Sequence, residues 1–312
     1  MGNSFYFEWE RILMEFLQGS GSHVLTAIAS FLSELGDQYV LVGILGFLYW
    51  GVNKEWGKYL FTSLGPVQIL PPMFKNIARR LRPYMVIPSI QCLKPLEPDY
   101  DLMNVTAQGY SFPSMHSASA AITYGALARY ANRRGNRNKI LLLIGIITPL
   151  LVAWSRVYVG VHFPTDVLFG LIFGLIFVFL MDFAQSKIKD HRIIYLVVLL
   201  AGMPGVFFCT SHDYFNSYGL VLGGYLGFMF EERFVNFKNT KSILIAIVRT
   251  VIGGALFLIL NAVFKLPFSA DFLESETRLV LMVRLFRYAA VSFCVIGVYP
   301  MIFKFLKAKK DL

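Results

Sequence analysis

Long apolar runs separated by short polar connections make up most of the 312-residue chain. As helices, runs of this length span a hydrocarbon core roughly 30 Å thick. The pattern predicts about nine transmembrane helices, near residues 38–51, 57–74, 114–131, 139–155, 164–183, 192–209, 217–230, 242–264 and 283–304. The apolar stretch at 24–35 is too short to cross comfortably, so we expect it to be half-inserted.

The N-terminal segment carries a different pattern. Residues 5–17 read FYFEWERILMEFL, which is typical of an amphipathic helix lying in the membrane interface. In the whole chain, 56% of the residues are hydrophobic and 15% are charged, whereas soluble domains are about half apolar and about a quarter charged. The sequence therefore predicts an all-α, polytopic membrane helix bundle that follows an interfacial segment.

The net charge of +10 would indicate nucleic acid in a soluble protein. In a membrane chain we attribute it to cytoplasmic Lys and Arg and to anionic lipid, and we expect no nucleic-acid partner. The positive-inside rule places alternate basic connections in the cytoplasm, with Lys54, Lys58, Arg133, Lys139, Lys187, Lys189, Arg192, Arg233, Lys238 and Lys241. The connections at 75–113 and 156–163 then lie outside, although the first carries Lys75, Arg79, Arg80 and Arg82. The positive-inside rule predicts few Lys and Arg residues outside, so these four cations require a local explanation.

Two polar segments on the outer side lie between the end of the second predicted span and the start of the third. The first, KNIARRLRP, places Lys75 and Arg82 on one face of a helix that Pro83 is expected to end. Basic side chains that snorkel from a helix end are the plainer explanation. In the second, FPSMHSASA, Ser114 is the expected N-cap of a helix whose N-terminus suits an anion. His116 falls in the first turn of that helix, where an ordinary polar role is the alternative.

The third segment, SRVYVGVHFPTD at 155–166, holds three ionisable residues between two apolar runs. Pro164 suits the first turn of a helix, so His162 lies just before that helix and Asp166 lies within its first turn. The four-residue offset lets the carboxylate accept a hydrogen bond from one imidazole nitrogen, which would fix the tautomer and support positive charge. An interfacial ion pair is the alternative.

All three segments emerge on the same side in this topology. Together they supply the cations Lys75, Arg82 and Arg156, a helix N-terminus, two histidines and one aspartate. They contain no carboxylate cluster that could hold Mg²⁺ or Zn²⁺, so we expect no metal and no other cofactor. Such a set suits a phosphate group, with cations for its oxygens, a nucleophile and a proton donor.

The three segments resemble the signature of the type 2 phosphatidic acid phosphatase superfamily, K-x6-RP, PSGH and SR-x5-H-x3-D, in order and in spacing. They stand here as Lys75…Arg82-Pro83, Pro113-Ser114-Met115-His116 and Ser155-Arg156…His162…Asp166. The resemblance covers about residues 38–184, so we divide the chain into interfacial helices at 1–37, a phosphatase core at 38–184 and further transmembrane helices at 185–312, without an assigned role. Met115 replaces the glycine of the signature, which affects substrate fit rather than the catalytic groups.

The resemblance also implies a role for each matching residue. His162 would attack phosphorus and form a phosphohistidine while Asp166 holds its other nitrogen. His116 would protonate the leaving alcohol and then activate water. Lys75, Arg82 and Arg156, helped by Ser114, would neutralise the developing charge. The residues by themselves do not decide which histidine attacks.

We therefore expect an integral-membrane phosphatase that hydrolyses a lipid phosphate monoester or a polyprenyl diphosphate without a metal ion. Its site would lie on the non-cytoplasmic face of the plasma or inner membrane, where the motifs leave the hydrocarbon within reach of a tail-anchored phosphate. A lipid phosphotransferase with the same intermediate is one alternative. Another is a non-catalytic lipid-phosphate binding or transport protein, which would not need the His162–Asp166 couple.

Overall fold

The computed structural model describes residues 2–94, 101–133, 138–275 and 277–304, so the predicted C-terminal segment is described only as far as residue 304. These residues form helices, and between the described segments the only β-type pairing is a single bridge from Asn3 to Arg80. The chain divides into two compact units, Met1–Leu41 with Leu70–Phe183, and Val42–Ile69 with Ala184–Leu312. All three sequence motifs belong to the first unit.

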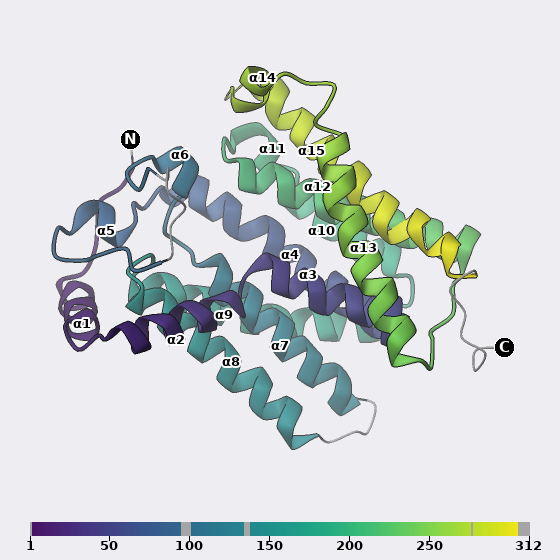
Figure 1. Ribbon diagram of the computed structural model, residues 1–312, viewed down its shortest axis with the longest axis horizontal. Helices are drawn as coiled ribbons and strands as arrows, with labels where there is room; N and C mark the ends of the chain where they lie inside the picture. Colours follow the sequence, from purple (N-terminus) through teal and green to yellow (C-terminus); the bar gives the residue numbers. More distant parts are fainter. Residues whose placement is uncertain (1, 95–100, 134–137, 276, 305–312) are drawn as a thin grey trace. The chain divides into compact units, whose positions relative to one another are not determined.

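The first unit is a set of helices built around α8. Its elements are α1 (Glu8–Gly19), α2 (His23–Glu34), the start of α3 (Gln38–Gly46), the end of α4 (Lys54–Ala78), α5 (Pro83–Val86), α6 (Val105–Gln108), α7 (Met115–Arg133), α8 (Lys139–Tyr158) and α9 (Pro164–Lys187). Helix α8 lies beside α7 and also contacts α2 and α1 (Figure 1). Helix α9 approaches α7 closely at Gly170, where an added Cβ would lie 2.5 Å from the Ser114 carbonyl oxygen. Only glycine permits that approach, which brings the second and third motifs together.

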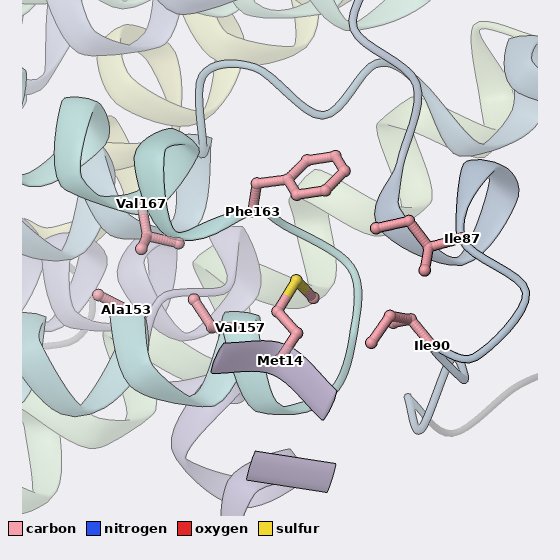
Figure 2. Packing of buried hydrophobic residues seen from close by; sticks show 7 residues of the cluster. All are labelled: Met14, Ile87, Ile90, Ala153, Val157, Phe163 and Val167. Carbon is pink, nitrogen blue, oxygen red and sulfur yellow. The ribbon is translucent and has the colours of Figure 1, made fainter. Parts of the chain in front are cut away.

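Helix α1 is amphipathic, as the sequence predicts. Trp9 and Phe16 are exposed, whereas Glu10 and Met14 are fully buried. The Met14 side chain enters an apolar cluster directly beneath the third motif (Figure 2). The other members of this cluster are Ile87, Ile90, Ala153, Val157, Phe163 and Val167. The N-terminal helix is therefore packed against the segment that carries the third motif.

The expectation of about nine spans is not confirmed. Among the described residues, five helical segments are long and apolar enough to cross a membrane: Lys139–Tyr158, Pro164–Lys187, His191–Phe208, Ile243–Val263 and Arg278–Phe303. A sixth is possible if α2 and the segment Gln38–Val52, which are bent by 47° at their junction, count as one span. The stretch at 24–35 that we expected to be half-inserted belongs to this bent pair.

Helix α7 is one of the predicted spans that is not among these segments. The run at 114–131 lies in α7, which is rich in Ala and Ser and ends in arginine. Most of its residues are buried against other helices, among them Ser117, Ser119 and Thr123. A helix enclosed by protein does not need a lipid-facing apolar surface, so its hydropathy stays low.

The second unit consists mainly of the C-terminal helices. They are α10 (His191–Gly202), α11 (Gly205–Phe208), α12 (His212–Phe230), α13 (Ile243–Val263), α14 (Ala270–Glu274) and α15 (Arg278–Phe293), with the short turns η1 (Phe47–Val52), η2 (Glu231–Val235), η3 (Cys294–Val298) and η4 (Tyr299–Lys304). Helices α12 and α15 pack with their backbones close together: a Cβ on Gly219 would lie 2.2 Å from the Leu285 oxygen, and one on Gly223 would lie 2.0 Å from the Ala289 oxygen. Small residues at the contact are typical of membrane helix pairs.

Helix α4 begins at a buried ion pair in the second unit. The Lys54 and Lys58 ammonium groups lie 3.0 Å and 3.4 Å from the two carboxylate oxygens of Glu231, which is fully buried. Because an uncompensated buried carboxylate would be costly, these two contacts tie the start of α4 to η2.

We expect Met14→Ala to loosen α1, because it removes a fully buried side chain and leaves a cavity. The free energy of unfolding should fall by about 2–5 kcal/mol. The measurement is the thermal unfolding midpoint in detergent. Ile12→Ala is the control, because Ile12 lies on the same helix and is 55% exposed. Equal midpoints for the two variants would contradict the packing role of Met14.

Candidate active site

The first motif does not form the continuous helix that the sequence predicts. Helix α4 ends at Ala78, Arg79 adopts a φ of 50°, and Arg82 has an extended backbone before α5. Hydrogen bonds from Asn3 N to Arg79 O (2.6 Å) and from Leu81 N to Asn3 O (2.8 Å) hold this segment out of the helix. The prediction that Lys75 and Arg82 share a helical face is therefore wrong, and Pro83 begins α5 instead of ending α4.

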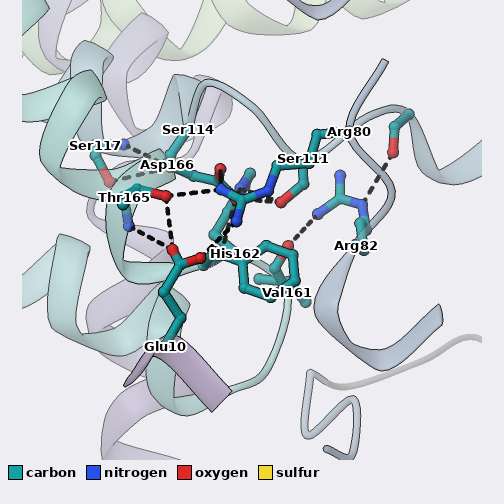
Figure 3. A network of polar contacts seen from close by, with 12 residues as sticks. Glu10, Arg80, Arg82, Ser111, Ser114, Ser117, Val161, His162, Thr165 and Asp166 are labelled. Atoms are coloured by element: carbon teal, nitrogen blue, oxygen red, sulfur yellow. Dashed lines mark hydrogen bonds and ion pairs between the residues drawn. The ribbon is translucent and has the colours of Figure 1, made fainter. Parts of the chain in front are cut away.

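Arg82 holds together the segments that precede the second motif and His162. Its Nη2 donates to Gln108 O at 2.6 Å, its Nε donates to Gly109 O at 3.1 Å and its Nη1 donates to Val161 O at 3.1 Å (Figure 3). A guanidinium has five N–H donors. Arg82 can therefore hold the backbone of the site and still donate to an anion.

The second motif begins α7 as predicted. The Ser114 side chain caps the helix, because its Oγ accepts from Ser117 N at 3.4 Å and from Ser117 Oγ at 3.0 Å. The backbone N–H of Ser114 donates to Asp166 O at 3.1 Å. The helix N-terminus of the second motif is thus hydrogen-bonded directly to the third.

The third motif places His162 and Asp166 together, with one difference from the prediction. His162 Nδ1 lies 3.7 Å from Asp166 Oδ2, which is longer than a direct hydrogen bond. Ser111 Oγ lies 3.5 Å from the same nitrogen and donates to the same carboxylate oxygen, so it links the two groups. Phe163 N also donates to Asp166 Oδ2, at 2.8 Å. His162 and Asp166 are almost completely buried.

Arg80 lies between two buried carboxylates, one of which is Asp166. Its Nη1 is 2.7 Å from Asp166 Oδ1 and its Nη2 is 2.6 Å from Glu10 Oε2 (Figure 3). The other Glu10 oxygen accepts from Thr165 N at 3.1 Å and from Thr165 Oγ1 at 2.6 Å. The guanidinium also stacks on the ring of Phe163, at 3.9 Å from the ring centroid. Arg80, one of the four cations that the positive-inside rule left unexplained, is therefore a structural partner of Asp166.

Sequence reasoning missed Arg80, Glu10 and Ser111 as parts of this site. The one available signal was Glu10, which lies four residues before Met14 on an amphipathic helix and so shares its face. A carboxylate beside a core methionine requires a partner. Nothing in the sequence identified that partner, since Arg80 is seventy residues away.

Positive charge surrounds the His162 imidazole. Burial and then the charges of Arg82, Arg156 and Lys75 lower the pKa of His162 well below its ordinary value. Lys75 and Arg156 are themselves buried, and the Arg156 Nη1 donates to Ser33 Oγ of α2. The ring is therefore neutral at physiological pH. Nδ1 faces Ser111 and the Asp166 carboxylate, which favours the tautomer with the proton on Nδ1 and the lone pair on Nε2.

His116 lies on the first turn of α7 with 29% of its side chain exposed. Its Nε2 is 3.7 Å from Oδ2 of Asp37, a residue of the turn between α2 and α3 that sequence reasoning did not connect with the site. The structure thus brings a neutral buried histidine, a second histidine, three cations and a capped helix N-terminus into one region of the first unit. In the part of the chain that is described, no three His, Cys, Asp or Glu side chains group closely enough to hold a metal ion.

Comparison with known proteins gives the family. Residues 56–188 match the PAP2 superfamily, and residues 215–311 match the transmembrane extension of PAP2 superfamily phosphatases. The chain is 32% identical over 158 residues to phosphatidylglycerophosphatase B of Bacillus subtilis, which covers 49% of this chain and 68% of that protein. It is 30% identical over 151 residues to undecaprenyl-diphosphatase of Sulfolobus acidocaldarius, which covers 48% of this chain and 66% of that protein.

A solved structure is also similar to this chain. It is a crystal structure of a transmembrane PAP2-type phosphatidylglycerolphosphate phosphatase from Bacillus subtilis, with a TM-score of 0.45 and 26% identity, covering 59% of this chain and 90% of the other. The transmembrane extension and the apolar helices make the protein an integral membrane protein. From the domain match and the first relative, the chain belongs to the PAP2 superfamily of phosphatases, which are phosphoric ester hydrolases.

Proposed function

We propose that this membrane phosphatase hydrolyses a lipid phosphate monoester or a polyprenyl diphosphate through a phosphohistidine on His162, without a metal ion. The observation that carries the proposal is the His162 ring, which is buried, surrounded by cations that lower its pKa, and linked through Ser111 to Asp166. A lipid substrate is supported by the relatives, one named for phosphatidylglycerophosphate and one for undecaprenyl diphosphate. We place the site on the non-cytoplasmic face of the plasma or inner membrane, from the distribution of Lys and Arg.

In the first half-reaction, Nε2 of His162 attacks phosphorus and an N–P bond forms. The P–O bond to the leaving group breaks, and the leaving oxygen takes its electron pair and a proton from His116. Positive charge that develops on the His162 ring is stabilised at Nδ1 by Ser111 and the Asp166 carboxylate. This is the orienting role that a carboxylate plays beside a catalytic histidine.

In the second half-reaction, water gives a proton to His116 and its oxygen attacks phosphorus. The N–P bond breaks, orthophosphate leaves and His162 returns to its neutral form. Lys75, Arg82 and Arg156 neutralise the phosphoryl oxygens in both steps, together with the N–H groups at the start of α7. Three cations supply the charge compensation that metal ions provide in many other phosphoryl-transfer enzymes.

Labelling tests the intermediate. We expect wild type incubated with ³²P-labelled lipid phosphate and EDTA to form an acid-labile, base-stable phosphoryl adduct. His162→Asn should abolish the adduct and lower kcat by about 10³-fold or more. His23→Asn is the matched control, because His23 is exposed and outside the site. Persistent labelling in the His162 variant, or complete loss of wild-type turnover in EDTA, would contradict the proposal. Transfer of label to added glycerol in preference to water would identify a phosphotransferase.

The pH dependence follows from the lowered pKa of His162. The neutral ring is the active form, so activity should persist as the pH falls below about 6.5, the ordinary pKa of histidine. Activity should be lost only when the pH passes through the lowered pKa. The measurement is kcat/KM from pH 4 to 8, with ionisation of the substrate phosphate followed separately by ³¹P NMR. An acidic limb centred at or above 6.5 would show that the ring is not held neutral.

Arg80→Gln should disable the site without removing a catalytic group. It leaves the Glu10 and Asp166 carboxylates buried without their shared cation, so we expect a loss of about 3–5 kcal/mol of stability. Activity should fall even under conditions where the variant remains folded, because Asp166 is no longer held beside Ser111 and His162. Arg79→Gln removes the same charge from the adjacent exposed position and should leave both properties nearly unchanged. Similar losses of stability and activity in the two variants would contradict the role of Arg80 as the shared partner of Glu10 and Asp166.

A further inference from the structure

The turn between α2 and α3 lies directly against the helix that carries His116. Leu35 O accepts a hydrogen bond from Tyr124 Oη of α7 at 3.0 Å. Gly36 is packed so closely that an added Cβ would lie 3.0 Å from the His116 carbonyl oxygen and 2.7 Å from a Val152 methyl carbon. The backbone before Asp37 is therefore fixed relative to His116.

The Asp37 carboxylate is also fixed locally. Its Oδ1 accepts from Tyr39 N at 2.8 Å, which orients the side chain at the start of α3. Its Oδ2 then faces His116 Nε2 at 3.7 Å, which is within ion-pair distance and, as for His162 and Asp166, longer than a direct hydrogen bond. Both side chains are partly exposed, at 25% and 29%, so the pair lies at the open side of the site.

The surroundings of His116 explain why a carboxylate beside its ring would matter. Burial and then the charge of Arg156 lower the pKa of His116 to about 3, and Lys75 acts in the same direction. Asp37 is the group that opposes this shift and favours the protonated ring. The ring also lies on the first turn of α7, where the helix dipole disfavours a cation. A histidine that must donate a proton in such surroundings requires a nearby carboxylate.

We propose that Asp37 is a positioning residue for His116, attracting the protonated ring at its Nε2 side so that Nδ1 exchanges the proton with the leaving group and with water. The inference rests on the proposed function, in which His116 is the general acid. The site then contains two histidine–aspartate couples. Asp166 supports the nucleophile His162, and Asp37 supports the proton donor His116.

The test uses the dependence of kcat/KM on the leaving group, because kcat/KM reports the steps up to leaving-group release. Two substrates are compared, a long-chain alkyl phosphate and a nitrophenyl phosphate that carries an alkyl tail. An alkoxide needs a proton as it leaves, whereas a nitrophenolate does not. We expect Asp37→Asn to lower kcat/KM by about 10²-fold or more for the alkyl ester. For the nitrophenyl ester we expect a change of less than about threefold, and Asp37→Glu should restore part of the alkyl-ester activity.

Glu34→Gln is the matched control, because Glu34 is an exposed acid at the end of α2 and its loss changes the net charge equally. We expect it to leave both substrates unaffected. In a His116→Asn background, Asp37→Asn should cause little further loss of alkyl-ester activity, because the proposed role of Asp37 is exerted through His116. This comparison between two folded proteins remains informative if the single variant is less stable.

Equal losses on the two substrates, or an additive loss in the His116→Asn background, would overturn the role of Asp37. These outcomes are distinct from failure of the proposed function. That failure would appear as absent turnover or absent His162 labelling in wild type. If wild type is labelled and turns over while Asp37→Asn shows no leaving-group dependence, only the present inference fails.

Discussion

The site depends on the compensation of buried charge around Arg80. A buried carboxylate is costly unless a cation and hydrogen bonds satisfy it, and Asp166 and Glu10 share one guanidinium. The three residues come from α1, the segment after α4 and the first turn of α9. Their ion pairs therefore join three distant parts of the chain at the point where His162 must be oriented.

Around His162, by contrast, the site carries an excess of positive charge. Lys75, Arg82 and Arg156 direct positive charge at a neutral His162, and burial strengthens that field because little water screens it. In the proposed mechanism an incoming phosphate restores the balance, which favours binding, and the same cations stabilise the charge that moves during phosphoryl transfer. In the same proposal the negative charge of Asp166, compensated by Arg80, supports the imidazole without cancelling the positive field that acts on the phosphate.

The N-terminal segment contributes more to the site than an interfacial anchor would. Glu10 holds Arg80, Ser33 accepts from Arg156 and Asp37 faces His116. Met14 packs beneath the third motif at the same time (Figure 2). A segment that lies outside the family signature thus contacts Arg80 beside Asp166, the cation Arg156 and His116.

The sequence by itself determined the helical membrane class, the Ser114 cap and the proximity of His162 to Asp166, because these follow from composition and from contacts within a few residues. It did not determine the number of spans, since helices such as α7 are buried by protein instead of lipid. Only the tertiary structure decided that α4 ends before Arg82, because Asn3 pairs with the segment after it. It also decided which acids meet Arg80 and His116. Those partners are seventy or more residues apart, and local pattern carries no information about such contacts.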